Sequence, residues 1–465
     1  MGAIRRCVLC KLRRGRVRLG AVALGALALT ASAGGTVACR GPSRLAQELA
    51  ELEGAPAPPA TIILISIDTL RADHLGAYGY PLPTSPELDE LARDAVVFED
   101  CRAQSSATLT SHASLMTSRL PRHHGASYDR SLALASGIPT LATVLRSAGY
   151  RTAAVTGGGQ LDPVFGLGQG FDRYVVANSK KLARALPRAL RWLRRNDRDP
   201  VFLFLHTYEV HHPYQAPKLL PLFETDYRGT LPATTSVELL EEINRGERTL
   251  DAADLAHIIH TYDAGIRSMD RALGMLFDRL RNMGRYDDAL IVVTSDHGEE
   301  FGEHGMVGWH SHTLHRELLR VPLLLKLPQS VGGGARIGTP VRSIDIAPTI
   351  LAAVGIEPPS SFAGVNLLEE PERIEQQPAV SELDTAADVS SVSLGRWKLY
   401  DGDLYDLDAD PWEQRPLEGH STRRQELEEV AAELLNEFAV RIGAPAELTD
   451  ETLEQLDALG YVADD

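Results

Sequence analysis

The chain has 465 residues, of which 44% are hydrophobic and 24% are charged, and its formal net charge is −16. This composition is ordinary for a globular protein and excludes the collagen-like, coiled-coil and disordered classes. The length is sufficient for one large α/β domain with an appendage, or for two or three smaller domains.

The charge is distributed unevenly along the chain. The first 18 residues hold seven Arg or Lys and no acid, and the next twenty residues hold no charge. A basic segment, an apolar segment and small residues in this order are typical of a secretory signal, so residues 1–39 predict export to the periplasm or cell envelope. The rest of the chain then carries −23, which argues against nucleic-acid binding.

The end of this signal contains a cysteine with two open interpretations. Cys39 follows Thr-Val-Ala, which resembles a bacterial lipobox with Thr in place of the usual Leu. One alternative is lipid attachment at Cys39, and the other is plain cleavage after Ala33 or a retained signal anchor. Residues 40–60 end in Pro and Ala and are predicted to be a spacer. Only Cys39 and Cys101 would remain after cleavage, so no disulfide framework is expected.

The next part of the chain alternates between strand and helix patterns. Residues 60–67, 200–205 and 287–293 are short apolar runs of strand length, rich in β-branched or aromatic residues. Helices are predicted over residues 86–95 and 141–148, a basic helix over 180–195, and a long amphipathic helix over 268–284. This alternation predicts an α/β fold with a large, mostly parallel sheet sandwiched by helices.

Two further regions have a different pattern. Residues 215–255 lack clear periodicity and are predicted to be an inserted loop region. Residues 389–407 alternate and turn through Gly, as a small antiparallel sheet does, and an acidic helix follows. The sequence therefore predicts a catalytic domain over residues 61–364 and a smaller α+β subdomain with an antiparallel sheet over residues 365–465.

Each of the three apolar runs ends in side chains that can bind metals. In open α/β sheets, ligands bind outside the carboxyl ends of the strands, so groups that are distant in sequence can converge there. Two carboxylates and several imidazoles in one place predict a metal site. The residues concerned are Asp68, His206, Glu209, His211, His212, Asp296 and His297.

Several motifs together resemble the sulfatase family of the alkaline phosphatase superfamily. They are IDTLRADHLGAYGY, ATLTSHASLMTS, FLFLHTYEVHHPY, TSDHGEEFGEHG and VRSIDIAPTILAAVGI, and they occur in the family's order over residues 60–360. The segment LYDLDADPWEQ and the tail ALGYV resemble the small C-terminal part of bacterial members. The resemblance implies an alkaline-phosphatase-like fold and an ester hydrolase.

The resemblance also implies roles for individual residues. Asp68, Asp296 and His297 match the family's ligands for one divalent metal ion, and an oxygen of the nucleophile, Thr108, completes the set. Ca²⁺ and Mg²⁺ suit the carboxylates, while Zn²⁺ or Mn²⁺ also suit an imidazole with a bound alkoxide. His211 matches the histidine that contacts the ester or protonates its leaving group.

Two more histidines match substrate positions of the family. His310 falls where a His or Lys holds the substrate anion, and His112 stands where formylglycine sulfatases carry an Arg. In the family motif the nucleophile is Cys or Ser, which can be oxidised to formylglycine, and here it is Thr108. Thr69 stands where many sulfatases carry a further Asp ligand, so the metal shell is predicted to be smaller or differently charged.

A threonine nucleophile favours a phosphate ester, because a threonyl sulfate has no second hydroxyl to expel the sulfate by elimination. The expected substrate is therefore a small-molecule, glycan or lipid-headgroup ester of phosphoric or sulfuric acid, with phosphate preferred. Two alternatives remain open: a phosphotransferase with chemistry like that of phosphoethanolamine transferases, and a catalytically silent surface protein that binds an anionic glycan or lipid headgroup. For His304, His312 and His315, structural roles are favoured over a second metal site.

Overall fold

The computed structural model describes residues 60–369, 377–385 and 389–461 of the chain. The predicted signal, the cysteine at position 39 and nearly all of the predicted spacer lie outside the described residues. Among the residues that are described, no helix is both long and apolar enough to cross a membrane.

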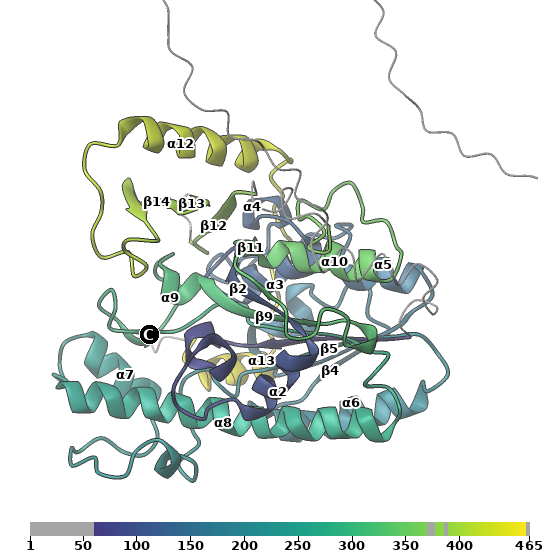
Figure 1. Cartoon of the computed structure of the whole chain (residues 1–465), viewed down its shortest axis with the longest axis horizontal. Helices are drawn as coiled ribbons and strands as arrows, with labels where there is room; N and C mark the ends of the chain where they lie inside the picture. The colour runs from purple at the N-terminus through teal and green to yellow at the C-terminus, as the bar shows by residue number, and fades with distance from the viewer. Residues whose placement is uncertain (1–59, 370–376, 386–388, 462–465) are drawn as a thin grey trace, which may run out of the picture. The chain divides into compact units, whose positions relative to one another are not determined.

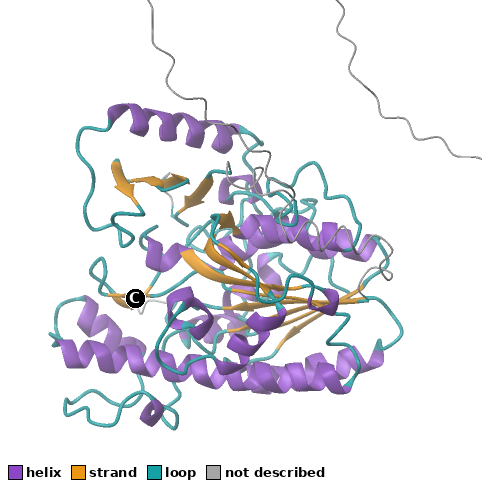
Figure 2. Ribbon diagram, in the orientation of Figure 1, coloured by secondary structure: helices purple, strands orange, loops and turns teal. Residues whose placement is uncertain are grey.

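A nine-stranded mixed sheet forms the centre of this structure (Figures 1 and 2). Its strand order is β10-β2-β9-β6-β1-β5-β3-β4, with β11 also paired to β2. Only β9 runs antiparallel to its neighbours, β2 and β6, so the predicted mostly parallel sheet is confirmed. The strands of this sheet are β1 (Thr61–Ile67), β2 (Val96–Arg102), β3 (Arg151–Thr156), β4 (Arg173–Val176), β5 (Val201–Thr207), β6 (Leu290–Thr294), β9 (Arg320–Lys326), β10 (Arg336–Ile337) and β11 (Val341–Arg342).

The three apolar runs predicted as strands are neighbours in the middle of the sheet. Strand β1 pairs in parallel with β5 on one side and with β6 on the other. Ile67 lies opposite Thr207, and Ser66 lies opposite Thr294, so all three strands end at the same edge. The residues that follow these strands are therefore brought together, as expected from the sequence.

Side chains of the central strands alternate between two hydrophobic cores. Ile62 and Leu64 pack into a core with helices α3, α5 and α10, whereas Ile63 and Ile65 pack into a core with α2, α6 and α8. Burying one such side chain stabilises the fold by about 1.5–3 kcal/mol. The helices that cover the sheet are α2 (Pro86–Asp94), α3 (Thr108–Thr117), α5 (Leu141–Ser147), α6 (Leu182–Arg195), α8 (Ala252–Asn282) and α10 (Ile346–Ala353).

The predicted helices are present, but the region 215–255 is more ordered than expected. Helix α7 (Val237–Asn244) lies inside it, because the Ser236 hydroxyl accepts a hydrogen bond from the amide of Leu239 and caps the helix. Helix α8 also begins far earlier than residue 268, after a capping box at Asp251. The prediction of a loop over the whole region was therefore wrong.

A small antiparallel sheet follows the large one, as predicted. Its strands, in the order β12-β13-β14-β15, pack against helix α12 through a separate core. The last helix, α13, behaves differently: Leu456 on α13 is buried in the core of the large sheet. The remaining elements are α4 (Pro121–His124), β7 (Glu300–Phe301), β8 (Val307–Trp309), α9 (Arg316–Leu319), β12 (Ala379–Glu382), β13 (Ser390–Leu394), β14 (Trp397–Tyr400), β15 (Asp403–Asp406), α12 (Ser421–Asn436) and α13 (Asp450–Asp457).

Candidate active site

Three predicted metal ligands meet where β1 and β6 end. Asp68, Asp296 and His297 are all buried, and one potential ligand atom from each lies within 4.8 Å of the others. His297 donates from Nδ1 to the carbonyl oxygen of Gly298 (2.9 Å), so in the neutral ring the lone pair is on Nε2. That Nε2 atom lies 3.4 Å from Oδ2 of Asp296. The arrangement has the donor atoms of a cation site.

Each carboxylate is held by one oxygen and leaves the other oxygen without a partner. Oδ2 of Asp68 accepts from Nε2 of His206 (3.3 Å), and Oδ1 of Asp296 accepts from the amides of His297 (3.0 Å) and Thr69 (3.3 Å). Oδ1 of Asp68 and Oδ2 of Asp296 are buried and have no hydrogen-bond partner. Because a buried unpaired carboxylate oxygen is costly, these two orphan atoms fit a bound divalent cation.

The electrostatics of the two carboxylates agree with this fit. Burial raises the pKa of Asp68 to about 6, although the nearby imidazole of His297 opposes the shift. Burial also raises the pKa of Asp296, and the charge of Asp68 adds to the effect. Two close, buried acidic groups resist ionising together, and a divalent cation between them would favour the ionised form of both.

Thr69 is one of the residues at which the sequence departs from the pattern of the family that it resembles. Its backbone has a φ of +56°, a region that β-branched residues rarely adopt. Its buried hydroxyl oxygen has no hydrogen-bond partner. Strained residues of this kind often lie at functional sites, and here the backbone conformation aims the Thr69 amide at the Asp296 carboxylate.

Thr108 is the first residue of α3 and faces the carboxylate and histidine group. Its Oγ1 lies 3.2 Å from Nε2 of His297 and 3.1 Å from the hydroxyl of Tyr461. The next amide, that of Leu109, donates to the side-chain oxygen of Gln160 (2.9 Å) and so fixes the first turn of the helix. Thr108 itself is fully buried.

The other hydroxyls in residues 105–118 are engaged elsewhere or have no hydrogen-bond partner. That of Ser111 donates to the backbone carbonyl of Asp296 (2.7 Å) and so joins α3 to the loop that follows β6. The hydroxyl of Ser105 has no partner. The remaining contacts are Ser106 to Thr313 O, Thr110 to Ala126 O, Ser114 to His124 Nε2, Thr117 to Ala113 O and Ser118 to Ile344 O.

His112, for which a substrate-binding role is predicted, is fully buried, and its Nδ1 lies 3.4 Å from Oδ2 of Asp296. Its Nδ1 donates to the carbonyl oxygen of Thr108 (2.8 Å), and its Nε2 accepts from the hydroxyl of Ser66 (2.9 Å). Burial lowers its pKa to about 4, so the ring is neutral. One helical turn separates residues 108 and 112, which places His112 beneath the nucleophile, where it supports the turn.

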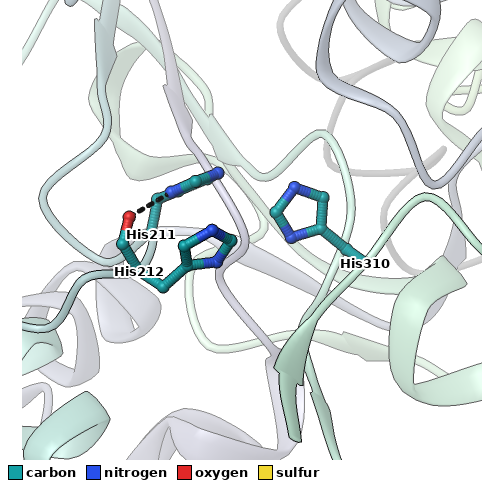
Figure 3. Close-up of side chains that lie close together, drawn as sticks. All are labelled: His211, His212 and His310. Carbon is teal, nitrogen blue, oxygen red and sulfur yellow. Dashed lines mark hydrogen bonds between the residues drawn. The ribbon is translucent and has the colours of Figure 1, made fainter. Parts of the chain in front are cut away.

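A second group of histidines lies next to the first, with the ring centroids of His297 and His310 4.6 Å apart. His211, His212 and His310 are buried, with one potential ligand atom from each within 4.8 Å of the others (Figure 3). Nδ1 of His211 donates to the carbonyl of His212, and Nδ1 of His310 donates to Oε1 of Glu299 (2.8 Å). In neutral rings these contacts place the lone pairs on the two Nε2 atoms. Burial lowers the pKa of His211 well below its ordinary value.

Two charged residues hold these histidines in position. Lys180 donates from Nζ to the carbonyl oxygens of His211 (2.9 Å) and His212 (2.6 Å), and burial lowers its pKa to about 7. Burial alone would raise the pKa of Glu299, but the imidazoles of His310 and His212 hold it below its usual range. Neither Lys180 nor Glu299 was predicted from the sequence: Glu299 lies in the motif TSDHGEEFGEHG, but the resemblance assigns it no role, and Lys180 lies in none of the motifs.

Tyr461 is the least expected member of the site. Its hydroxyl lies 2.9 Å from Nε2 of His211 and 3.2 Å from Nε2 of His310, and it also contacts Thr108. The ALGYV segment was noted for its family resemblance only, since no local signal joins residue 461 to residue 108. The structure thus brings Thr108, His211 and His310 around one point, and Tyr461 occupies it.

The predicted structural interpretation of His304, His312 and His315 agrees with their contacts. Each pairs with a glutamate: His304 with Glu317 (2.7 Å), His312 with Glu300 (2.7 Å) and His315 with Glu413 (2.9 Å). The two ligand groups found among the described residues do not include them.

Comparison with known proteins agrees with this geometry. The model of the sulfatase family matches residues 60–356. A multifunctional alkaline phosphatase superfamily protein, PehA of Trinickia caryophylli, is 32% identical over 205 residues, 39% of each chain. The choline-sulfatase of Rhizobium meliloti is 26% identical over 76% of this chain and 81% of its own.

Among solved structures, the phosphonate monoester hydrolase of Agrobacterium radiobacter has the same fold. It superposes with a TM-score of 0.67 at 20% identity, over 82% of this chain and 96% of its own. The family model covers well over half of the chain, and the fold agrees with it. The chain therefore belongs to the sulfatase family of ester hydrolases, within the alkaline phosphatase superfamily.

Proposed function

We propose that the protein is an exported, metal-dependent hydrolase of phosphoric or sulfuric esters, with Thr108 as its nucleophile and phosphate esters preferred. One observation carries the proposal: Oγ1 of Thr108 lies 3.2 Å from Nε2 of His297, beside two carboxylates with orphan oxygens. Relatives named as a multifunctional alkaline phosphatase superfamily protein and a choline-sulfatase support an ester hydrolase.

Asp68, Asp296, His297 and Thr108 would hold one divalent cation. When bound, such a cation lowers the pKa of a hydroxyl and neutralises the charge of the ester oxygens. The carboxylates suit Ca²⁺ or Mg²⁺, and His297 leaves Zn²⁺ or Mn²⁺ open. His206 orients Asp68 through its hydrogen bond to Oδ2, as the outer residues of metal sites commonly do.

The reaction would run in two displacements. Thr108 Oγ1 releases its proton to solvent, from which it takes one back when the threonyl ester is cleaved, and attacks the phosphorus or sulfur atom, so that the bond to the leaving alcohol breaks. The leaving oxygen takes a proton, for which His211 Nε2 is placed once a bound anion favours the imidazolium form. Water then cleaves the threonyl ester, which returns the Thr108 hydroxyl and releases phosphate or sulfate.

The preference for phosphate follows from this second displacement. A formylglycine diol has a second hydroxyl that can expel sulfate by elimination, whereas a threonyl ester must be attacked by water directly. His310, held by Glu299, is placed to contact the ester oxygens. His112 has no such role in this proposal, since both of its ring nitrogens bond groups of the protein.

The proposal is tested with matched 4-nitrophenyl esters. Purified protein, freed of metal and reloaded in turn with Ca²⁺, Mg²⁺, Mn²⁺ or Zn²⁺, is assayed on sulfate, phosphate monoester, phosphate diester and phosphonate monoester substrates. We expect turnover of at least one phosphorus ester to exceed that of the sulfate. Robust sulfate turnover without any phosphoesterase activity would overturn the preference, and silence on every substrate would favour the anion-binding alternative.

We also propose export to the periplasm or cell envelope, with lipid attachment at Cys39. The support is the basic, apolar and small-residue order of residues 1–39. Wild type and Cys39→Ala should be fractionated from a bacterial host. The lipid-anchored form is expected in the membrane fraction and the variant in the soluble periplasm, whereas intact, unprocessed chain in the cytoplasm would contradict export.

A further inference from the structure

The hydroxyl of Tyr461 occupies the point on which the proposed catalytic groups converge. It contacts the nucleophile Thr108 at 3.1 Å, His211 at 2.9 Å and His310 at 3.2 Å. An ester under attack by Thr108 would place its oxygens in the same space. Two groups cannot share that space, so the phenol and the ester anion exclude each other.

We propose that Tyr461 is an internal pseudosubstrate: the segment 449–461 holds its phenol in the anion site, and an anionic ester binds only when this phenol withdraws. The proposal rests on the proposed function in placing the ester beside Thr108. It concerns a residue of the ALGYV segment, to which the family resemblance assigns no role. The affinity of the site for an anionic ester would then depend on competition between this ester and the phenol of Tyr461.

The segment is docked on the site by specific contacts. Leu456 is fully buried and Leu459 nearly so, and the side chain of Gln455 accepts from the amide of Gly159 (2.9 Å). The hydroxyl of Tyr128 donates to the carbonyl of Tyr461 (3.1 Å). These contacts fix the direction in which the phenol enters, so its position is not that of a loose chain end.

The turn before the tyrosine requires a glycine. Gly460 has a φ of +80°, and a Cβ at this residue would lie 3.1 Å from the methyl groups of Val237 and 3.3 Å from Nε2 of His212. A side chain there would be strained and crowded. Gly460 thus lets the backbone pass close to the histidine group and direct Tyr461 inward.

Two cavities are lined in part by the docked segment. One cavity, of about 320 Å³, is lined by Lys180 and Tyr208 and, from the segment 449–461, by Gln455 and Leu459. Another, of about 640 Å³, is lined by Gln215, Arg245 and Gly460 among others. The segment therefore lines two spaces that are large enough for a small ester, while Thr108 itself is fully buried.

The hydrogen bonding of the docked phenol is incomplete. The Nδ1 contacts of His211 and His310 leave both Nε2 atoms as acceptors when the rings are neutral, and one phenol proton can satisfy only one of them. Burial keeps the phenol itself neutral. A dihydrogen phosphate ion carries two O–H donors as well as acceptor oxygens, so it can satisfy both Nε2 atoms where the phenol satisfies one, and it can therefore compete with the phenol.

The test measures binding of inorganic phosphate, without turnover, to the metal-loaded full-length chain by calorimetry. We compare wild type with Tyr461→Phe, Tyr461→Ala and the control Leu453→Ala, an exposed position on the same helix. If the phenol fills the site nine-tenths of the time, Tyr461→Ala lowers the Kd about tenfold, because a competent fraction of one tenth weakens binding by that factor. The Kd of Tyr461→Phe is expected to lie between those of wild type and Tyr461→Ala, and the Kd of Leu453→Ala is expected to equal that of wild type.

A second readout is independent of the variants. Added phosphate should speed hydrogen exchange at the amides of Gly460 and Tyr461, which donate to Asp457 O and Leu456 O in the docked segment. An unchanged or weaker phosphate affinity in Tyr461→Ala, with its fold intact by circular dichroism, overturns the proposal, as does undiminished protection with bound phosphate. A tighter Kd in a variant that hydrolyses no ester supports this inference while counting against the proposed hydrolase.

Discussion

Replacing Thr108 with alanine is expected to reduce ester hydrolysis by at least about 10³-fold, since it removes the nucleophile and one predicted metal ligand together. The fold should persist, because the helix α3 around it is held by other contacts, including the Gln160 bond to Leu109. The measurement is kcat and kcat/KM on the best substrate of the ester panel, with circular dichroism as a check on folding.

The matched control is Ser111→Ala, one turn along the same helix. Its hydroxyl bonds the carbonyl oxygen of Asp296, so its loss is expected to cost about 1 kcal/mol of stability and to spare most of the activity. Thr108→Ser keeps the hydroxyl and should retain far more activity than Thr108→Ala. Full activity in Thr108→Ala, or equal losses in Thr108→Ala and Ser111→Ala, would contradict the assignment of the nucleophile.

The centre of the fold could be predicted because its signals are local and repeated. Strands β1, β5 and β6 are apolar runs with polar residues at or just after their carboxyl ends, so a parallel sheet with its site at the carboxyl edge follows from the pattern. Helix α7 was missed since it is a short helix with a single cap, Ser236, inside a stretch without clear periodicity. The start of this helix is set by its N-cap and not by a hydrophobic periodicity that can be read from the sequence.

The residues of the candidate site likewise fall into those that could be predicted from the sequence and those that could not. Asp68, Asp296 and His297 stand in motifs, and the structure brings them together with Thr108. The role of Glu299 could not be predicted, because it depends on tertiary contacts: its carboxylate contacts the imidazole rings of His310 and His212, which come from other parts of the chain.

Tyr461 reaches the site from 353 positions away in the chain, a distance over which no periodicity operates. His112 stands inside a motif, and the substrate role predicted for it stays a prediction, because a motif does not fix the direction of a ring in the fold. The turn of the helix instead points its ring toward Ser66 and the backbone.

Replacing Asp296 with asparagine is expected to have two effects of opposite sign. It removes a charged ligand, so the divalent metal bound after dialysis should fall well below one per chain, and hydrolysis should fall by at least about 10³-fold. In the metal-free protein, however, the same change removes the buried negative charge of Asp296, which lies beside the carboxylate of Asp68. Oδ2 of Asp296 has no hydrogen-bond partner there. The thermal midpoint of the metal-free variant is therefore expected to equal or exceed that of metal-free wild type.

Two other variants serve as an intermediate case and as a control. His206→Gln removes an outer partner of Asp68, not a ligand, and should weaken metal binding by only about 10–100-fold. Asp278→Asn, a largely exposed change on α8, should alter neither property. Metal content by mass spectrometry and thermal midpoints with and without chelator separate the two effects. If Asp296→Asn destabilises the metal-free protein or leaves its metal content at the wild-type level, the buried carboxylates do not form the cation site, and their orphan oxygens need another explanation.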